Sequence, residues 1–267
     1  RSSDLAEARV LQQEARYRFK QGQGIRVFSR PERLQKWCDE NSVNLSERRH
    51  LITNAGELVP GFTLRKHGVE FFVHSPFAVR QDVNTVEDRN GDAIVVHATF
   101  EVAGAKTKVL LMADSTHEAL TDIVNITKSK GNDDRLEWDV VELPHHCSYL
   151  SLGPDKGDEK TVPVDELEWL YGEQGLEGGV IVSTSKPIPS SGTKEDSDPQ
   201  PPHRQAANYY KGVVAKMDGQ FVVTMEHPKE SAPEPVVIEV GSAGATLKVS
   251  AVTGVYVATS RPAPRAG

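Results

Sequence analysis

The sequence predicts an α/β or α+β protein with at least one large β-sheet. Short apolar runs of the strand type recur along the chain, and segments with helical periodicity lie between several of them. Of 267 residues, 37% are hydrophobic and 26% charged, which is typical of a folded globular chain. The net charge of -7 argues against a basic nucleic-acid-binding surface over the whole molecule. We interpret the basic stretch at 46–50 as a solvated turn, although a nucleic-acid substrate would suit it.

The apolar runs and the cysteines indicate the cellular compartment of the protein. No segment holds 18 consecutive apolar residues and no signal peptide is visible, so we expect no membrane contact. Cys38 and Cys147 are far apart and fit no CxxC pattern. We therefore expect a cytoplasmic protein with two free thiols.

The first elements are predicted to be helices. Residues 4–20 place apolar side chains at three- and four-residue steps, which is the pattern of an amphipathic helix. Residues 24–29 indicate a short strand. Ser29 lies three residues before Glu32, with Pro31 between them, so a second helix should begin there and bury Cys38.

Strands then dominate. Residues 62–77 resemble two strands around a turn at His67-Gly68, and residues 92–104 and 106–114 predict a hairpin joined near Gly104. The remaining pattern alternates. It predicts a helix at 115–128, a strand at 136–144, a helix at 165–175, a strand at 178–185, an exposed loop at 185–202, a helix at 203–217, and strands of a closing sheet at 220–227, 235–241 and 246–258.

Three strand ends carry polar residues of the metal-ligand type. Asp114 follows one strand, His145 and His146 follow the next, and His203 opens a helix after the third strand and its loop. Sites on sheet proteins gather where strands end and loops begin. A carboxylate and two or three imidazoles meeting there are the ligand set of a Zn²⁺ or Mn²⁺ hydrolase. The alternative is that each histidine is a hydrogen-bonded structural residue.

Other residues near these positions are weaker candidates for a catalytic or metal-binding role. Cys147 beside His146 suggests a thiol nucleophile, but adjacent residues on an extended chain point to opposite faces and do not make a dyad. Ser148 lacks a Gly-x-Ser-x-Gly elbow, which favours a cap or turn role. His74 and His117 could approach the site, although a structural role for His74 and an exposed helix position for His117 are the alternatives.

The same motifs resemble the second half of a metallo-β-lactamase-fold hydrolase. The subgroup is the one typified by the hydrolase domain of the ComEC DNA-uptake protein and by phosphorylcholine esterases. Its strand-ending Gly-Asp corresponds to Ala113-Asp114, its Pro-His-His-Gly-Ser motif to residues 144–148, and its helix-opening histidine to His203. The similarity covers roughly residues 25–225.

This resemblance implies an αββα metallo-β-lactamase sandwich, mostly its second half. Residues 1–230 would form that domain, and residues 231–267 a C-terminal β extension and tail. Asp114 would be the metal-bridging carboxylate. His145 or His146 would be a ligand while the other supports it, and His203 would be the last ligand or a transition-state donor.

The implied function is that of a bacterial phosphodiesterase or nuclease that uses a metal-bound hydroxide on nucleic acid or a nucleotide. The family's main motif, His-x-His-x-Asp-His, is absent from the 267 residues, and glycine is replaced at Ala113 and Cys147. We expect the motif just before Arg1, which would complete a site for two Zn or Mn ions, or else it has been lost. In the second case the protein is a degenerate member that acts as a binding or regulatory partner. A third alternative is that a partner chain or missing segment completes the site.

Overall fold

The main sheet has six strands that are hydrogen-bonded in chain order. The computed structural model describes residues 6–28, 31–76 and 93–248. The strands are β1 Val69–Ser75, β2 Val95–Val102, β3 Ala105–Leu111, β4 Trp138–Glu142, β5 Gly175–Ser183 and β6 Gln220–Val223. The pairs β1–β2 and β2–β3 are antiparallel, whereas the pairs β3–β4, β4–β5 and β5–β6 are parallel. This mixed sheet with intervening helices confirms the predicted α/β or α+β class.

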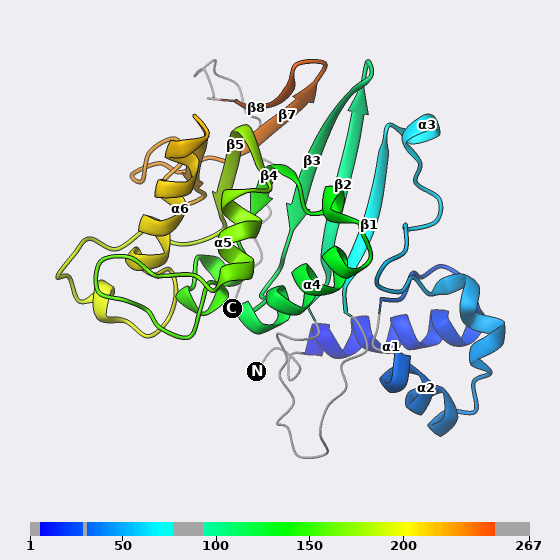
Figure 1. Ribbon diagram of the computed structural model, residues 1–267. Helices are drawn as coiled ribbons and strands as arrows, with labels where there is room; N and C mark the ends of the chain where they lie inside the picture. The colour runs from blue at the N-terminus through cyan, green and yellow to red at the C-terminus, as the bar shows by residue number, and fades with distance from the viewer. Residues whose placement is uncertain (1–5, 29–30, 77–92, 249–267) are drawn as a thin grey trace.

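Three helices cover one face of this sheet: α4 His117–Ser129, α5 Asp165–Gly172 and α6 Arg204–Lys216 (Figure 1). Side chains alternate across a strand, so neighbours in β4 face opposite sides. Val141 joins the large core under the helices, and Val140 joins a smaller core on the other face. Ile126 of α4 lies off the buried face of the helix and is 44% exposed.

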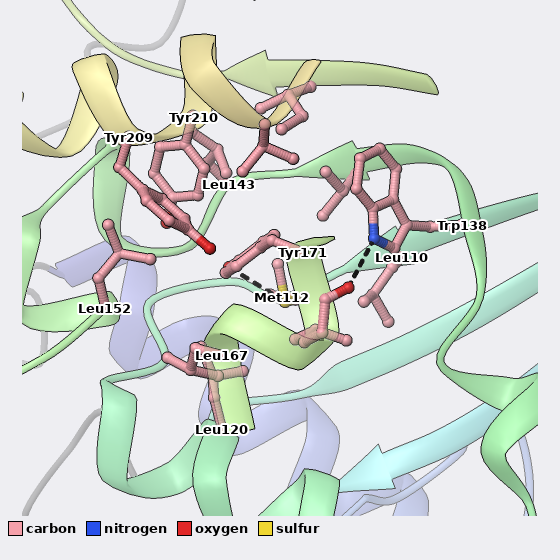
Figure 2. Close-up of a cluster of buried hydrophobic side chains, with 14 of the residues drawn as sticks. Leu110, Met112, Leu120, Trp138, Leu143, Leu152, Leu167, Tyr171, Tyr209 and Tyr210 are labelled. Carbon is pink, nitrogen blue, oxygen red and sulfur yellow. Dashed lines mark hydrogen bonds between the residues drawn. The ribbon is translucent and has the colours of Figure 1, made fainter. Parts of the chain in front are cut away.

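Trp138, Tyr171 and Tyr210 fill the centre of the large core (Figure 2). The indole N–H of Trp138 donates to the carbonyl of Leu170 at 3.1 Å, and the rings of Tyr171 and Tyr210 meet edge to face at 5.0 Å. Because Trp138 begins β4, this packing fixes the strand that leads into the predicted His-His motif.

The opposite face carries a hairpin, β7 Val237–Gly241 and β8 Gly244–Lys248. Its apolar side packs on Val140, Val180 and Val182. The expectation of a closing sheet was partly wrong, because only residues 220–227 supply a strand to the main sheet, and β7 and β8 form a separate one. The predicted strand beyond residue 248 lies outside the described residues.

The N-terminal elements are α1 Ala6–Gln21, α2 Pro31–Glu40 and the 3₁₀ helix η2 Leu45–Leu51. They share a small core around Phe19, Cys38 and Leu51, as predicted for Cys38. The predicted first helix is confirmed as α1, although Leu11 on its apolar face is 72% exposed. Helical periodicity marks a face that can be buried, whereas burial requires a neighbouring element.

The basic stretch at 46–50 is more than a solvated turn. Arg48 donates through Nε to the carbonyl of Phe19 at 2.9 Å and through Nη2 to that of Lys20 at 2.7 Å. His50 lies 2.8 Å from the carbonyl of Gly22. These contacts satisfy carbonyls at the C-terminal end of α1, where a cation also meets the negative end of the helix dipole.

Two predicted strands are wrong. Residues 62–68 form a helical turn, α3 Leu64–His67, instead of a strand. The Thr63 hydroxyl accepts from the backbone N–H of Lys66 at 3.3 Å, and Gly68 ends the turn at φ +67°. These cap signals outweighed the apolar alternation. Residues 24–28 supply only one bridge, Val27 to Ile52. Ser29 lies outside the described residues.

The loop at 185–202 is mostly exposed, as predicted, and contains the 3₁₀ turn η7 Glu195–Ser197. In the described part of the chain, no helix has the length and apolar character needed to cross a membrane.

Candidate functional site

The C-terminal ends of the parallel strands bring together the loops that hold Asp114, His145, His146 and His203. Backbone hydrogen bonds join these loops directly. The N–H of His145 donates to the carbonyl of Ala113 at 2.9 Å, and the N–H of His203 donates to the carbonyl of Cys147 at 3.1 Å. Parallel strands place their carboxyl ends at one sheet edge, so residues far apart in sequence meet there.

Asp114 and His146 form the open part of this edge. Their side chains are 57% and 53% exposed, and Oδ1 of Asp114 lies 3.6 Å from Nε2 of His146. Nδ1 of His146 is 2.8 Å from the carbonyl of Thr184. A carbonyl only accepts, so Nδ1 carries the proton of the neutral ring. The lone pair of Nε2 is therefore free and lies beside the carboxylate, which suits metal binding.

His203 has the opposite arrangement. Its side chain is 2% exposed, and Nδ1 accepts from the backbone N–H of Tyr149 at 3.3 Å. The neutral ring therefore carries its proton on Nε2, which is buried without a hydrogen-bond partner among the described residues. Burial lowers the pKa of His203, and the charge of Lys156 lowers it further. The backbone carbonyl of Pro199 lies close enough to this ring to raise its pKa and partly offset these effects, and the role of His203 as last ligand or donor stays a prediction.

His145 is half-buried, and its Nδ1 is also buried with no hydrogen-bond partner in the described part of the molecule. Its charge would lower the pKa of His203, so the two rings are electrostatic neighbours. Its role as ligand or supporting residue stays a prediction.

Asp114 and His146 place two atoms of the metal-ligand type side by side. Catalytic zinc sites use three protein ligands and an open position. Asp114 and His146 can supply two. Among residues 6–28, 31–76 and 93–248, no group of three or more His, Cys, Asp and Glu side chains is arranged to hold a metal ion.

Sequence reasoning missed Glu142, the last residue of β4. Its Oε1 accepts from the hydroxyl of Thr184 at 3.0 Å, and its Oε2 accepts from the backbone N–H of Met112 at 3.4 Å. Burial raises the pKa of this carboxyl. The signal was present in the sequence, because a glutamate within the apolar run of residues 138–143 needs partners wherever that run is buried.

The cysteine next to the histidines is not a nucleophile. Cys147 is fully buried, and burial raises the pKa of its thiol to about 12. The thiol is therefore protonated and inaccessible at neutral pH. The hydroxyl of Ser148 accepts from the N–H of Leu150 at 3.2 Å and caps the 3₁₀ turn η6 Tyr149–Ser151, as expected for a cap residue.

The two remaining histidine candidates make structural hydrogen bonds. Nε2 of His74 lies 2.9 Å from the carbonyl of Arg135, within the core. Nδ1 of His117 lies 3.0 Å from the carbonyl of Leu150 and 3.3 Å from the carboxylate of Glu118. Of these two side chains, only His117 is bonded to the loop that carries the His-His motif.

The backbone around the site adopts left-handed conformations at residues that are not glycine. Ala113 has φ +48°, and Cys147 has φ +66°. His145 and His146 in the 3₁₀ turn η5 Pro144–His146 also have positive φ. Such conformations cost about 1–2 kcal/mol each for L-residues and cluster at functional sites.

We expect Ala113→Gly to raise the free energy of unfolding by about 0.5–1 kcal/mol, because it relieves strain at an exposed side chain and loses little packing. Cys147→Gly should instead lower it, because that side chain is fully buried. Chemical denaturation of both variants measures the two changes. Equal destabilisation by both would contradict strain at Ala113.

No family model matches the chain, and neither does any curated protein or solved structure.

Proposed function

We propose that this chain carries part of the active site of a metal-dependent hydrolase of the metallo-β-lactamase fold, which cleaves phosphodiester bonds of nucleic acid or a nucleotide. The observation that carries the proposal is the Asp114–His146 pair, 3.6 Å apart, with the free Nε2 lone pair fixed by the Thr184 carbonyl. The sheet supports it too, because a sheet with its helices on one face resembles half of an αββα sandwich.

Each residue has a separate task in this proposal. Asp114 and His146 bind a Zn²⁺ or Mn²⁺ ion, and other groups complete its coordination. A divalent ion there would polarise a phosphoryl oxygen and activate a water molecule. His203 donates from Nε2 to an oxygen on which negative charge develops. Its low pKa keeps the ring neutral, with one fixed donor, at neutral pH.

We propose as second candidate a catalytically degenerate protein of this fold that acts as a binding or regulatory partner. Two observations favour it. The described residues assemble only two suitable ligand atoms, and Ala113 and Cys147 occupy left-handed positions where glycine would be unstrained.

Zinc titration by calorimetry tests the first candidate. We expect the purified chain to bind at least about half an equivalent of Zn²⁺ near neutral pH. Asp114→Ala and His146→Ala should each weaken binding about tenfold or more, because each removes one of two ligands. His67→Gln, which removes an exposed histidine on α3, is the matched control.

His203→Gln separates binding from chemistry. It should leave zinc affinity within about twofold and lower hydrolysis of bis(p-nitrophenyl) phosphate about 10²- to 10³-fold. The hydrolase proposal would be overturned if the unaltered chain bound no zinc. It would also be overturned if Asp114→Ala did not weaken zinc binding. Zinc binding without any hydrolysis would favour the degenerate protein.

A further inference from the structure

We infer that Glu142 is the positioning residue of this edge and holds the loops of Asp114 and His146 in fixed relation to each other. The inference rests on the proposed function in that the positioned pair is taken to bind a metal ion. Neither motif of the family resemblance includes Glu142, which precedes the Pro-His-His motif by two residues.

The position of Glu142 in the sheet explains how one side chain reaches both loops. β4 lies between β3 and β5, and Glu142 pairs with Leu111 on one side and Val182 on the other. Its two carboxylate oxygens contact the chain just beyond these neighbours, at Met112 and Thr184. One side chain therefore joins the ends of three adjacent strands.

Each carboxylate oxygen of Glu142 contacts a residue that lies close to a proposed ligand or is bonded to one. Met112 is two residues before Asp114, so the bond to its N–H holds the start of the Asp114 loop. Thr184 donates its hydroxyl to Glu142, and its carbonyl accepts from Nδ1 of His146. Glu142 thus fixes the residue that selects the protonated nitrogen of His146. Groups that hold a metal-binding histidine in this way influence metal affinity strongly.

A carboxylate suits this position because it accepts both from the backbone N–H of Met112, which can only donate, and from the hydroxyl of Thr184. A glutamine would accept from one of them and direct its own N–H₂ toward the other. None of the ion pairs among the described residues includes Glu142. An ordinary structural salt bridge therefore does not explain this half-buried charge.

Nitrogen-15 NMR of the His146 ring in metal-free protein tests the inference, with the signal assigned by its loss in His146→Gln. In the unaltered chain we expect the proton on Nδ1 alone. Glu142→Leu should give a mixture of the two neutral tautomers, Glu142→Gln an intermediate mixture, and Thr184→Val a mixture as well, because it removes the hydroxyl and keeps the carbonyl. Glu177→Leu, which removes an exposed carboxylate of β5, is the control and should leave the ring unchanged.

The same variants are then titrated with Zn²⁺. Glu142→Leu and Thr184→Val should each weaken zinc binding about 10- to 100-fold, with a non-additive double variant because both act through one hydrogen bond. An unchanged His146 tautomer in Glu142→Leu and Thr184→Val would overturn the inference, whatever the metal result. If the unaltered chain binds no zinc, the proposed function fails, while the tautomer measurement still decides the role of Glu142.

Discussion

The free energy of unfolding should fall steeply as the pH is lowered from about 6.5 to 4, because two buried histidines resist protonation. His74 and His97 are 5% and 1% exposed, and burial lowers the pKa of each from 6.5 to about 4. Burial is the cause, because the backbone carbonyl that each ring meets favours the protonated form and only partly offsets the lowering of the pKa. Nε2 of His74 and of His97 each lie 2.9 Å from a backbone carbonyl, and Nδ1 of His97 has no hydrogen-bond partner within the described residues.

The direction follows from proton binding. Between pH 4 and 6.5 the unfolded chain binds protons at these residues and the folded chain does not, so stability rises with pH over this window. A pKa difference of this size corresponds to about 3 kcal/mol per histidine. The raised pKa values of Asp139 and Glu142 act in the opposite direction. Variants are therefore needed to isolate the histidines.

Urea denaturation between about pH 4.5 and 7 measures the effect. His74→Gln and His97→Gln should each reduce the pH-dependent loss over this range by about 2.5 kcal/mol, even where they lower stability at neutral pH. His67→Gln, at an exposed position, is the control and should keep the full loss. The same pH dependence in all four proteins would show that the two histidines are not the cause.

Replacing Trp138 by alanine should lower the free energy of unfolding by about 3–5 kcal/mol. The indole is fully buried at the start of β4, and its N–H is bonded to Leu170 (Figure 2). A Cβ on Gly175 or Gly179 would lie 2.6 or 2.7 Å from the ring, so these glycines leave the space that the indole fills. The surrounding backbone has little freedom to close the cavity that alanine would leave.

Chemical denaturation at neutral pH measures this change. The stability of Trp138→Phe should lie between those of the unaltered protein and Trp138→Ala, because phenylalanine keeps a ring and loses the hydrogen bond. Val162→Ala, at a side chain that is 75% exposed, is the control and should change stability by less than about 0.5 kcal/mol. A loss below about 1 kcal/mol in Trp138→Ala would mean that the core rearranges around the cavity.

The candidate site shows how much of a functional site residue patterns can predict. Asp114, His145 and His146 could be chosen because each follows a predicted strand, and strand ends gather at one sheet edge. Their chemistry could not be chosen in this way. Which nitrogen of His146 is free depends on the carbonyl of Thr184, and which nitrogen of His203 is free depends on the N–H of Tyr149. These partners lie on loops that only the tertiary structure brings together.

The sequence alone determined the elements whose local signals agree: the hairpin at Gly104, the helices α4 to α6, and the buried strands β4 and β5. Hydrophobic period and turn chemistry act over a few residues, so they can be read from a single chain. Tertiary structure alone decided that Leu11 is exposed, that Arg48 binds the end of α1, and that Glu142 joins two loops. Burial and hydrogen bonding at these positions depend on neighbours that are remote in the chain, which no local pattern encodes.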